Sequence, residues 1–258
     1  MTKRDDPPGE DPLHRFDPPL VPGRLVRRYK RFLADVVLDD GAGAAVTAHC
    51  PNPGAMTGCA EPGMRVWLAP VKNPKAKLAW RWVLSETAEG VLVGVDTARA
   101  NAFARALIAR SAIPEFAGYA GVRTEVALGA GSRIDFLLED PVGRLAPLML
   151  EVKSVTLRRG AALAFPDAPT ARGRRHLDEL ARLARTGEGR AAVLYLAQRA
   201  DGDRFALACD IDPDYCRAAR RAADAGVAFI ARRLRLTPGA VHDDGPLPTR
   251  GDRAYVEA

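Results

Sequence analysis

Charged residues interrupt two short apolar segments near the middle of the chain, and this placement constrains the fold more than any other feature. The segments are residues 132–138 and 148–153. Successive residues of a strand face opposite sides of a sheet, so Glu151 and Lys153 share a face. Charges within apolar strands are costly unless they are paired or bind a metal ion. If the two strands are neighbours, we expect Asp135, Glu151 and Lys153 to converge.

An Asp followed at a distance by Glu-x-Lys is the pattern of PD-(D/E)XK nuclease-like cores, although the pattern alone is loose. Arg133 is expected on the same strand face as Asp135. Glu125 lies in the preceding predicted strand, and a short turn over residues 129–131 would bring it near Asp135 as a further acid. The alternative for Glu125 is a solvent-facing position.

Length and charge limit the class of protein. A chain of 258 residues can hold one large domain or two small ones. Its net charge of +6 favours a polyanionic partner, although such an excess also occurs in proteins that bind no nucleic acid.

Cysteine spacing and hydropathy bear on metal sites and compartment. None of the four cysteines is paired as C-x-x-C, which argues against structural zinc. The first residues lack an apolar signal segment, and no stretch reaches eighteen apolar residues. We therefore expect a cytoplasmic protein with reduced thiols.

The first third of the chain reads as a small β-barrel. Residues 1–22 hold six prolines and predict a disordered lead-in, and residues 23–95 predict a barrel domain. Its short strands are expected at residues 24–29, 32–38, 44–49, 65–69, 80–86 and 91–95. An oligonucleotide/oligosaccharide-binding (OB) barrel is the first choice among small barrels.

The opening of this barrel is basic, with two tryptophans further on. Cations interleaved with aromatic rings suit a groove that follows phosphates and stacks bases. The alternative is a solvated basic face with tryptophans in the core, and one of the pair is expected in the core either way. The candidate nucleic-acid-binding residues here are Arg27, Arg28, Lys30, Arg31, Trp80 and Trp82.

Residues 96–236 predict an α/β domain, and residues 237–258 predict a flexible tail. The order is a helix at 97–111 with Thr97 as N-cap, three strands, a helix at 171–186, a strand at 190–198, a helix at 212–225 and a last strand. Arg172 and His176 lie in the first turns of the second helix. Arginine there opposes the helix dipole, which makes more sense if an anion is bound.

Several motifs in order resemble those of the sugar fermentation stimulation protein A family. They are residues 27–36, His49-Cys50-Pro51-Asn52, residues 132–137, residues 151–157, Phe165-Pro166-Asp167-Ala168 and residues 210–213. The resemblance covers roughly residues 20–235.

This resemblance implies an N-terminal OB-like barrel, a C-terminal PD-(D/E)XK nuclease-like mixed sheet flanked by helices, and DNA binding without sequence preference. It also implies a link to sugar (maltose) metabolism. Carried over by position, the site residues are Asp135, Glu151 and Lys153, with Glu125 as a fourth. Asp135 and Glu151 would hold Mg²⁺ or Mn²⁺.

Three functions remain open at this stage. The first is a metal-dependent nuclease in which Arg133, Arg172 and His176 hold phosphates. The second is a regulator that binds DNA with a vestigial site. The third is a hydrolase of a small phosphorylated substrate. The sequence leaves the oligomeric state open.

Overall fold

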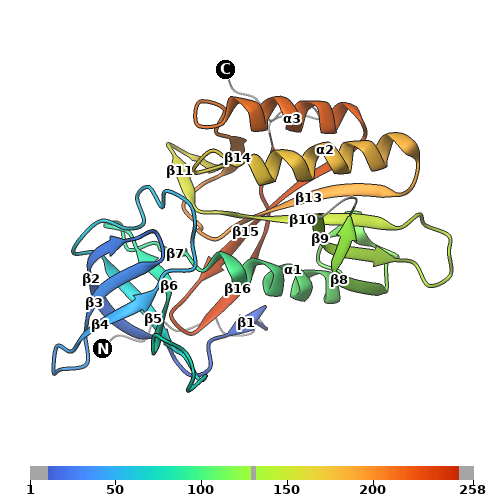
Figure 1. Ribbon diagram of the computed structural model, residues 1–258. Coiled ribbons are helices and arrows are strands. Elements are labelled where there is room, and N and C mark those ends of the chain that lie inside the picture. The colour runs from blue at the N-terminus through green and yellow to red at the C-terminus, as the bar shows by residue number, and fades with distance from the viewer. Residues whose placement is uncertain (1–10, 129–131, 250–258) are drawn as a thin grey trace.

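The computed structural model describes residues 11–128 and 132–249, which form a barrel joined to a larger sheet with helices on both faces (Figure 1). The predicted turn at residues 129–131 lies outside the described residues. In the described part of the chain, no helix is long and apolar enough to cross a membrane.

The barrel is closed by five strands. The strand order is β4-β3-β2-β5-β6-β7, and a parallel pairing of β4 with β6 closes the ring. Alternating apolar residues fill its interior, with Leu25, Val36, Leu68 and Trp82 fully buried. The strands are β2 (Val21–Tyr29), β3 (Leu33–Leu38), β4 (Ala45–His49), β5 (Arg65–Pro70), β6 (Trp80–Glu86) and β7 (Leu92–Gly94). This is the OB-like barrel that the sequence predicts.

The second body is a seven-stranded mixed sheet in the order β1-β16-β15-β13-β10-β9-β8. Central β13 runs parallel to both its neighbours and is almost wholly buried, as its continuous apolar run predicts. The strands are β1 (His14–Arg15), β8 (Gly121–Leu128), β9 (Ser132–Glu139), β10 (Leu148–Val155), β13 (Arg190–Ala197), β15 (Ala228–Leu236) and β16 (Ala240–Pro246).

Helices cover both faces of this sheet, which confirms the predicted nuclease-like architecture. Helix α1 (Ala100–Ala109) packs on one face, and α2 (Ala171–Thr186) and α3 (Pro213–Asp224) pack on the other (Figure 1). Single turns η1 (Thr97–Arg99) and η2 (Pro114–Phe116) flank α1. A small sheet of β11 (Leu157–Arg159), β12 (Ala162–Phe165) and β14 (Arg204–Leu207) was not expected.

Two predicted boundaries need correction. The expected lead-in contains β1, and the expected tail contains β16, which pairs with both β1 and β15. Proline-rich composition favours disorder, but pairing with a sheet supplies the missing hydrogen-bond partners.

Thr97 does not cap α1, because its hydroxyl donates to the Pro51 carbonyl oxygen at 2.8 Å.

The expectation of reduced thiols is wrong for one pair of cysteines. Cys209 and Cys216 form a disulfide between the loop after β14 and helix α3. Cys50 and Cys59 are free and buried in the barrel. Burial raises the pKa of the Cys59 thiol to about 11.

Candidate functional site

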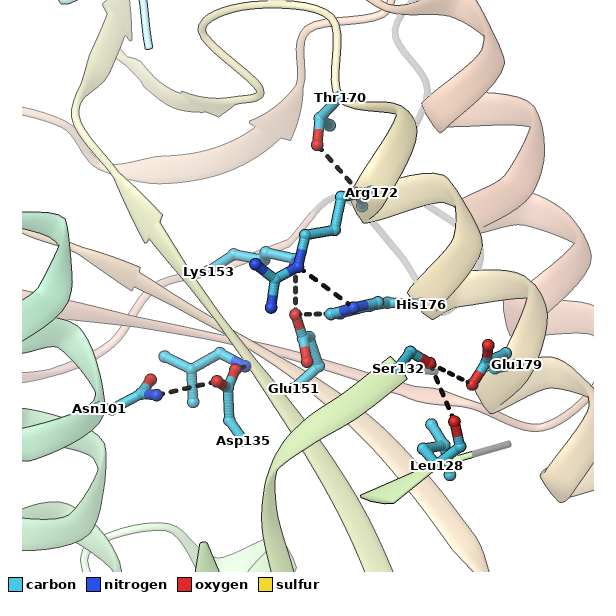
Figure 2. A network of polar contacts seen from close by, with 12 residues as sticks. Asn101, Leu128, Ser132, Asp135, Glu151, Lys153, Thr170, Arg172, His176 and Glu179 are labelled. Carbon is cyan, nitrogen blue, oxygen red and sulfur yellow. Dashed lines mark hydrogen bonds and ion pairs between the residues drawn. The ribbon is translucent and has the colours of Figure 1, made fainter. Parts of the chain in front are cut away.

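The site lies where β9 separates from β10. Pairing between these strands ends at Leu150 opposite Phe136. Beyond that point the Val152 amide has a side-chain acceptor in place of a strand partner, because it donates to Asp135 Oδ2 at 2.8 Å. Its Oδ1 accepts from the Asn101 side chain on α1, also at 2.8 Å. Asp135 is therefore fixed between the sheet and α1 (Figure 2).

Glu151 forms the centre of the site. Its Oε1 accepts from the Lys153 ammonium at 2.5 Å and lies 2.6 Å from Nδ1 of His176 on α2. Its Oε2 is buried and has no hydrogen-bond partner among the described residues. A buried carboxylate oxygen without a partner is costly, so this atom is available to a ligand that supplies positive charge.

The two carboxylates have opposite pKa shifts. Burial, together with the nearby charge of Glu151, raises the pKa of Asp135. Burial would also raise the pKa of Glu151, but the hydrogen bond with His176 and the charge of Lys153 outweigh it and lower that pKa. Glu151 is thus held as a carboxylate, whereas Asp135 carries a proton more readily than an ordinary aspartic acid.

The β8–β9 hairpin changes face beside Asp135. Ile134 packs with the cluster under α2 and α3, while Phe136 packs with the cluster under α1. Glu125 lies between the paired positions Thr124–Phe136 and Val126–Ile134, and it has a left-handed backbone with φ of +52°. The hairpin end therefore curls toward α2, where Ser132 donates to Glu179 Oε2 at 2.7 Å (Figure 2).

Because of this curl, the prediction that Arg133 and Asp135 share a strand face is wrong. Arg133 is exposed and lines a cleft beside α2, whereas Asp135 points to Asn101 and Val152. Strand alternation assumes a flat strand, and the twist breaks it. Glu125 lines the cleft with Arg133 and makes no hydrogen bond to Asp135 in the described residues.

The cleft between the hairpin and α2 has a volume of about 570 Å³. Three arginines and two glutamates line it, so the arginines leave an excess of positive charge. Arg133 and Arg175 have no hydrogen-bonding or ionic partner among the described residues, which leaves their donors to a ligand. The cleft is lined by Glu125, Ser132, Arg133, Arg172, Arg175, His176 and Glu179.

His176 does not hold an external phosphate in this arrangement. It is 4% exposed, and its ring lies between the cleft and Glu151. Its Nε2 accepts from Arg172 Nε at 3.5 Å. His176 was predicted to contact phosphate, but the structure gives it Glu151 as its closest partner.

The basic residues of the barrel are mostly engaged within the fold. Arg27 pairs with Asp35 at 2.8 Å, and Arg28 donates to four backbone carbonyl oxygens. Trp82 is fully buried and donates to the Leu84 carbonyl, so the prediction that it stacks on a base is wrong. Trp80 is half-buried against the barrel core. The side chains of Lys30 and Arg31 are exposed.

Among the described residues, Asp135 and Glu151 are the pair of carboxylates in this site that could hold a metal ion. Within the described ranges, no three His, Cys, Asp or Glu side chains cluster as a metal site. Asp135 and Glu151 could still hold a hard cation together if water completed its shell, as Mg²⁺ commonly permits. The unpartnered Glu151 Oε2 fits such an ion.

Comparison with known proteins agrees with this OB barrel and nuclease-like sheet. Residues 26–95 match the SfsA N-terminal OB domain, and residues 98–240 match the sugar fermentation stimulation protein RE domain. The chain belongs to the sugar fermentation stimulation protein family.

Individual relatives cover nearly the whole chain. A sugar fermentation stimulation protein homolog of Ruegeria sp. strain TM1040 is 50% identical over 91% of this chain and 100% of its own length. A homolog from Ruegeria pomeroyi is 51% identical over 88% of this chain and 97% of its own. The structure described as Pyrococcus furiosus SfsA in complex with Ca²⁺ has a TM-score of 0.84 and 27% identity, covering 94% of this chain and 100% of that one.

Proposed function

We propose that this protein binds DNA without sequence preference and cuts its phosphodiester backbone with Mg²⁺ or Mn²⁺. One observation carries the proposal: Glu151, whose Oε2 is buried and unpartnered, lies near enough to Asp135 to raise its pKa and contacts His176, which lines a cleft with three arginines. Two carboxylates that repel each other are stabilised by a cation between them, and the cleft suits a polyanion.

Asp135 and Glu151 would hold the ion through carboxylate oxygens, the ligands that hard divalent cations prefer. The related Pyrococcus furiosus protein, described as a complex with Ca²⁺, supports divalent cation binding in this family. A bound ion would polarise the scissile phosphate and lower the pKa of a coordinated water.

The chain's own side chains would position the substrate. The Lys153 ammonium, 2.5 Å from Glu151 Oε1, would donate to a phosphate oxygen as negative charge grows. The guanidinium groups of Arg133, Arg172 and Arg175 would hold neighbouring phosphates, since their forked donors match phosphate oxygens. His176 would keep Glu151 ionised and oriented through the 2.6 Å contact.

A second candidate is a DNA-binding regulator of sugar (maltose) metabolism whose nuclease site is vestigial. The observation that favours it is the engagement of Glu151 Oε1 by both Lys153 and His176, together with the missing third metal-ligating side chain among the described residues. Both candidates place the protein in the cytoplasm, where DNA and divalent cations are present.

Labelled DNA and RNA, each single- and double-stranded, would be incubated with the protein in Mg²⁺, Mn²⁺ or EDTA. Wild type should cleave DNA only with metal, and Asp135→Asn and Lys153→Met should lose cleavage by about 100-fold or more. Asp203→Asn is the matched control, because it removes the same charge at an exposed residue whose ionic partner in the described part of the chain is Arg204.

The outcomes separate the candidates. Metal-dependent cleavage that the control retains and both site variants lose supports the nuclease. Tight binding of DNA with no cleavage under any metal would favour the regulator. If wild type neither binds nor cleaves any strand, both candidates fail and a small phosphorylated substrate is the remaining class.

A further inference from the structure

A second feature of the barrel has no part in the proposed cutting site. The turn between β2 and β3 presents Phe32 at its end, and this side chain is 42% exposed. Phe32 is the exposed aromatic side chain in the part of the chain that the structure describes. The ring of His49 lies beside it, with centroids 6.5 Å apart.

The two residues before Phe32 have unusual backbones. Lys30 and Arg31 have φ of +47° and +64°, in the left-handed region. That conformation is unfavourable for residues with a Cβ, and glycine or asparagine is the usual occupant. Strain of this kind persists where surrounding contacts fix it, and it clusters at binding sites.

The fixing contacts come chiefly from Arg28. Its guanidinium donates to the carbonyl of Arg31 at 3.1 Å and to those of Asn52 and Gly54 at 2.8 and 3.0 Å. The Cys50 amide donates to the Phe32 carbonyl at 2.8 Å. The turn is thereby tied to residues 50–54, and the backbone that presents Phe32 is fixed by these contacts.

The same loop connects the turn to the cleft-bearing domain. The Met56 amide donates to Asp167 Oδ2 at 3.2 Å. The Asp167 carboxylate fills the space where a Cβ on Gly54 would stand, 2.1 Å from its Oδ2, so a larger residue there would displace Asp167. Asp167 precedes α2, whose first turns carry Arg172 and Arg175. The turn and the cleft therefore belong to one connected framework.

The side chains of the turn define a ligand. Lys30 and Arg31 are exposed and have no ionic partner among the described residues. An exposed ring that directly follows two exposed cations suits a nucleic acid whose base is unstacked, because stacking needs an open base face. In a duplex those faces are covered by neighbouring bases.

We propose that Phe32 stacks on an unpaired base of single-stranded DNA while Lys30 and Arg31 contact the adjoining phosphates. This inference rests on the proposed DNA binding, and it names the form of DNA that the barrel engages. Phe32 takes the stacking role predicted for Trp82, whose ring is enclosed by the barrel core.

The test is fluorescence anisotropy with labelled single-stranded DNA, the same strand with abasic sites, and the matching duplex, all in EDTA. Phe32→Ala should weaken single-strand binding by roughly 5- to 150-fold, the range for one base–aromatic stack. It should leave the abasic and duplex affinities within about twofold. Phe32→Tyr should bind as wild type, and Phe32→Leu should match Phe32→Ala.

A second measurement separates stacking from charge. The slope of log affinity against log salt should be unchanged in Phe32→Ala and reduced in Lys30→Ala. In Phe32→Trp, single-stranded DNA should quench the emission of the introduced indole relative to protein alone. The emission of the protein without DNA also shows whether the barrel is folded.

Three results would overturn the inference. Single-strand binding that survives Phe32→Ala within twofold would remove the stack while leaving DNA binding intact. An equal loss for strand and duplex would show a general effect on the barrel. If wild type binds no DNA at all, the inference falls together with the proposed function.

Discussion

The barrel and the cleft both carry arginines, but they use them differently. In the barrel, Arg27 pairs with Asp35 and Arg28 ties the β2–β3 turn to a neighbouring loop through carbonyl oxygens. In the cleft, Arg133 and Arg175 have no such partners in the described residues. A count of basic residues therefore does not locate a binding surface. What matters is whether each guanidinium has already been satisfied by the protein.

The largest expected difference between the two regions is in the rate of metal-dependent cleavage after one positive charge is removed from each. Lys153→Met should lower metal-dependent cleavage by about 100-fold or more, because its ammonium lies beside Glu151. Arg27→Met removes an exposed charge already paired with Asp35, so its cleavage rate should stay within about twofold. Single-turnover assays of both variants test this difference. Equal losses would contradict the separation of the two regions.

A second comparison concerns stability. Arg28→Ala leaves carbonyl oxygens of residues 31, 52, 54 and 55 without their donor, and it should destabilise the protein by about 2 kcal/mol. Arg133→Ala should change stability by no more than about 0.5 kcal/mol, yet weaken DNA binding. Urea unfolding and anisotropy, run on both variants, measure the two quantities. A stable Arg28→Ala protein would show that its contacts do not hold the turn.

A third prediction uses the raised pKa of Asp135. A carboxyl whose pKa is higher in the folded state stabilises the fold at low pH, and this contribution is lost as pH rises through the folded pKa. Asp135→Asn removes the charge but keeps hydrogen-bonding groups for Asn101 and the Val152 amide. The variant should therefore melt above wild type in EDTA, by a few degrees at pH 7 and by less at pH 4.

Calorimetry at pH 4 and pH 7 measures the difference in melting temperature between Asp135→Asn and wild type directly. A difference in melting temperature that shrinks as pH rises would contradict the assigned cause. Asp203→Asn, at an exposed position, should show no such trend.

The smallest effect is expected at the strained turn. Arg31→Gly relieves a left-handed backbone at φ +64° but adds entropy to the unfolded chain. The net gain in unfolding free energy should be up to about 1 kcal/mol. Single-strand affinity should fall, since a cation of the turn is lost. Urea unfolding that shows a loss of stability would argue that the turn is not strained.

Local patterns predicted the elements that depend on local chemistry. Helix α2 begins after Thr170, whose side chain accepts from the Gly173 amide, and ends at Gly187 in the left-handed conformation. Its bounds agree with the sequence because the cap, the apolar stripe and the glycine are all local signals. The six barrel strands were also predicted from local signals, namely short apolar runs between turn residues.

The predictions that failed concern features that depend on tertiary contacts. The contact of His176 with Glu151 joins residues 25 positions apart on different elements, and no spacing rule encodes it. The separate clusters of Ile134 and Phe136 result from a twist of the hairpin that strict alternation cannot express. The Cys209–Cys216 disulfide was missed because the expected cytoplasmic compartment predicted reduced thiols.

The central claim is that Asp135 and Glu151 together hold a divalent cation. Isothermal titration of Mn²⁺ into wild type, Asp135→Asn, Glu151→Gln and the Asp203→Asn control tests it without any substrate. We expect one Mn²⁺ site in wild type and in the control, and none in either site variant. Mn²⁺ binding of equal affinity in all four proteins would contradict it.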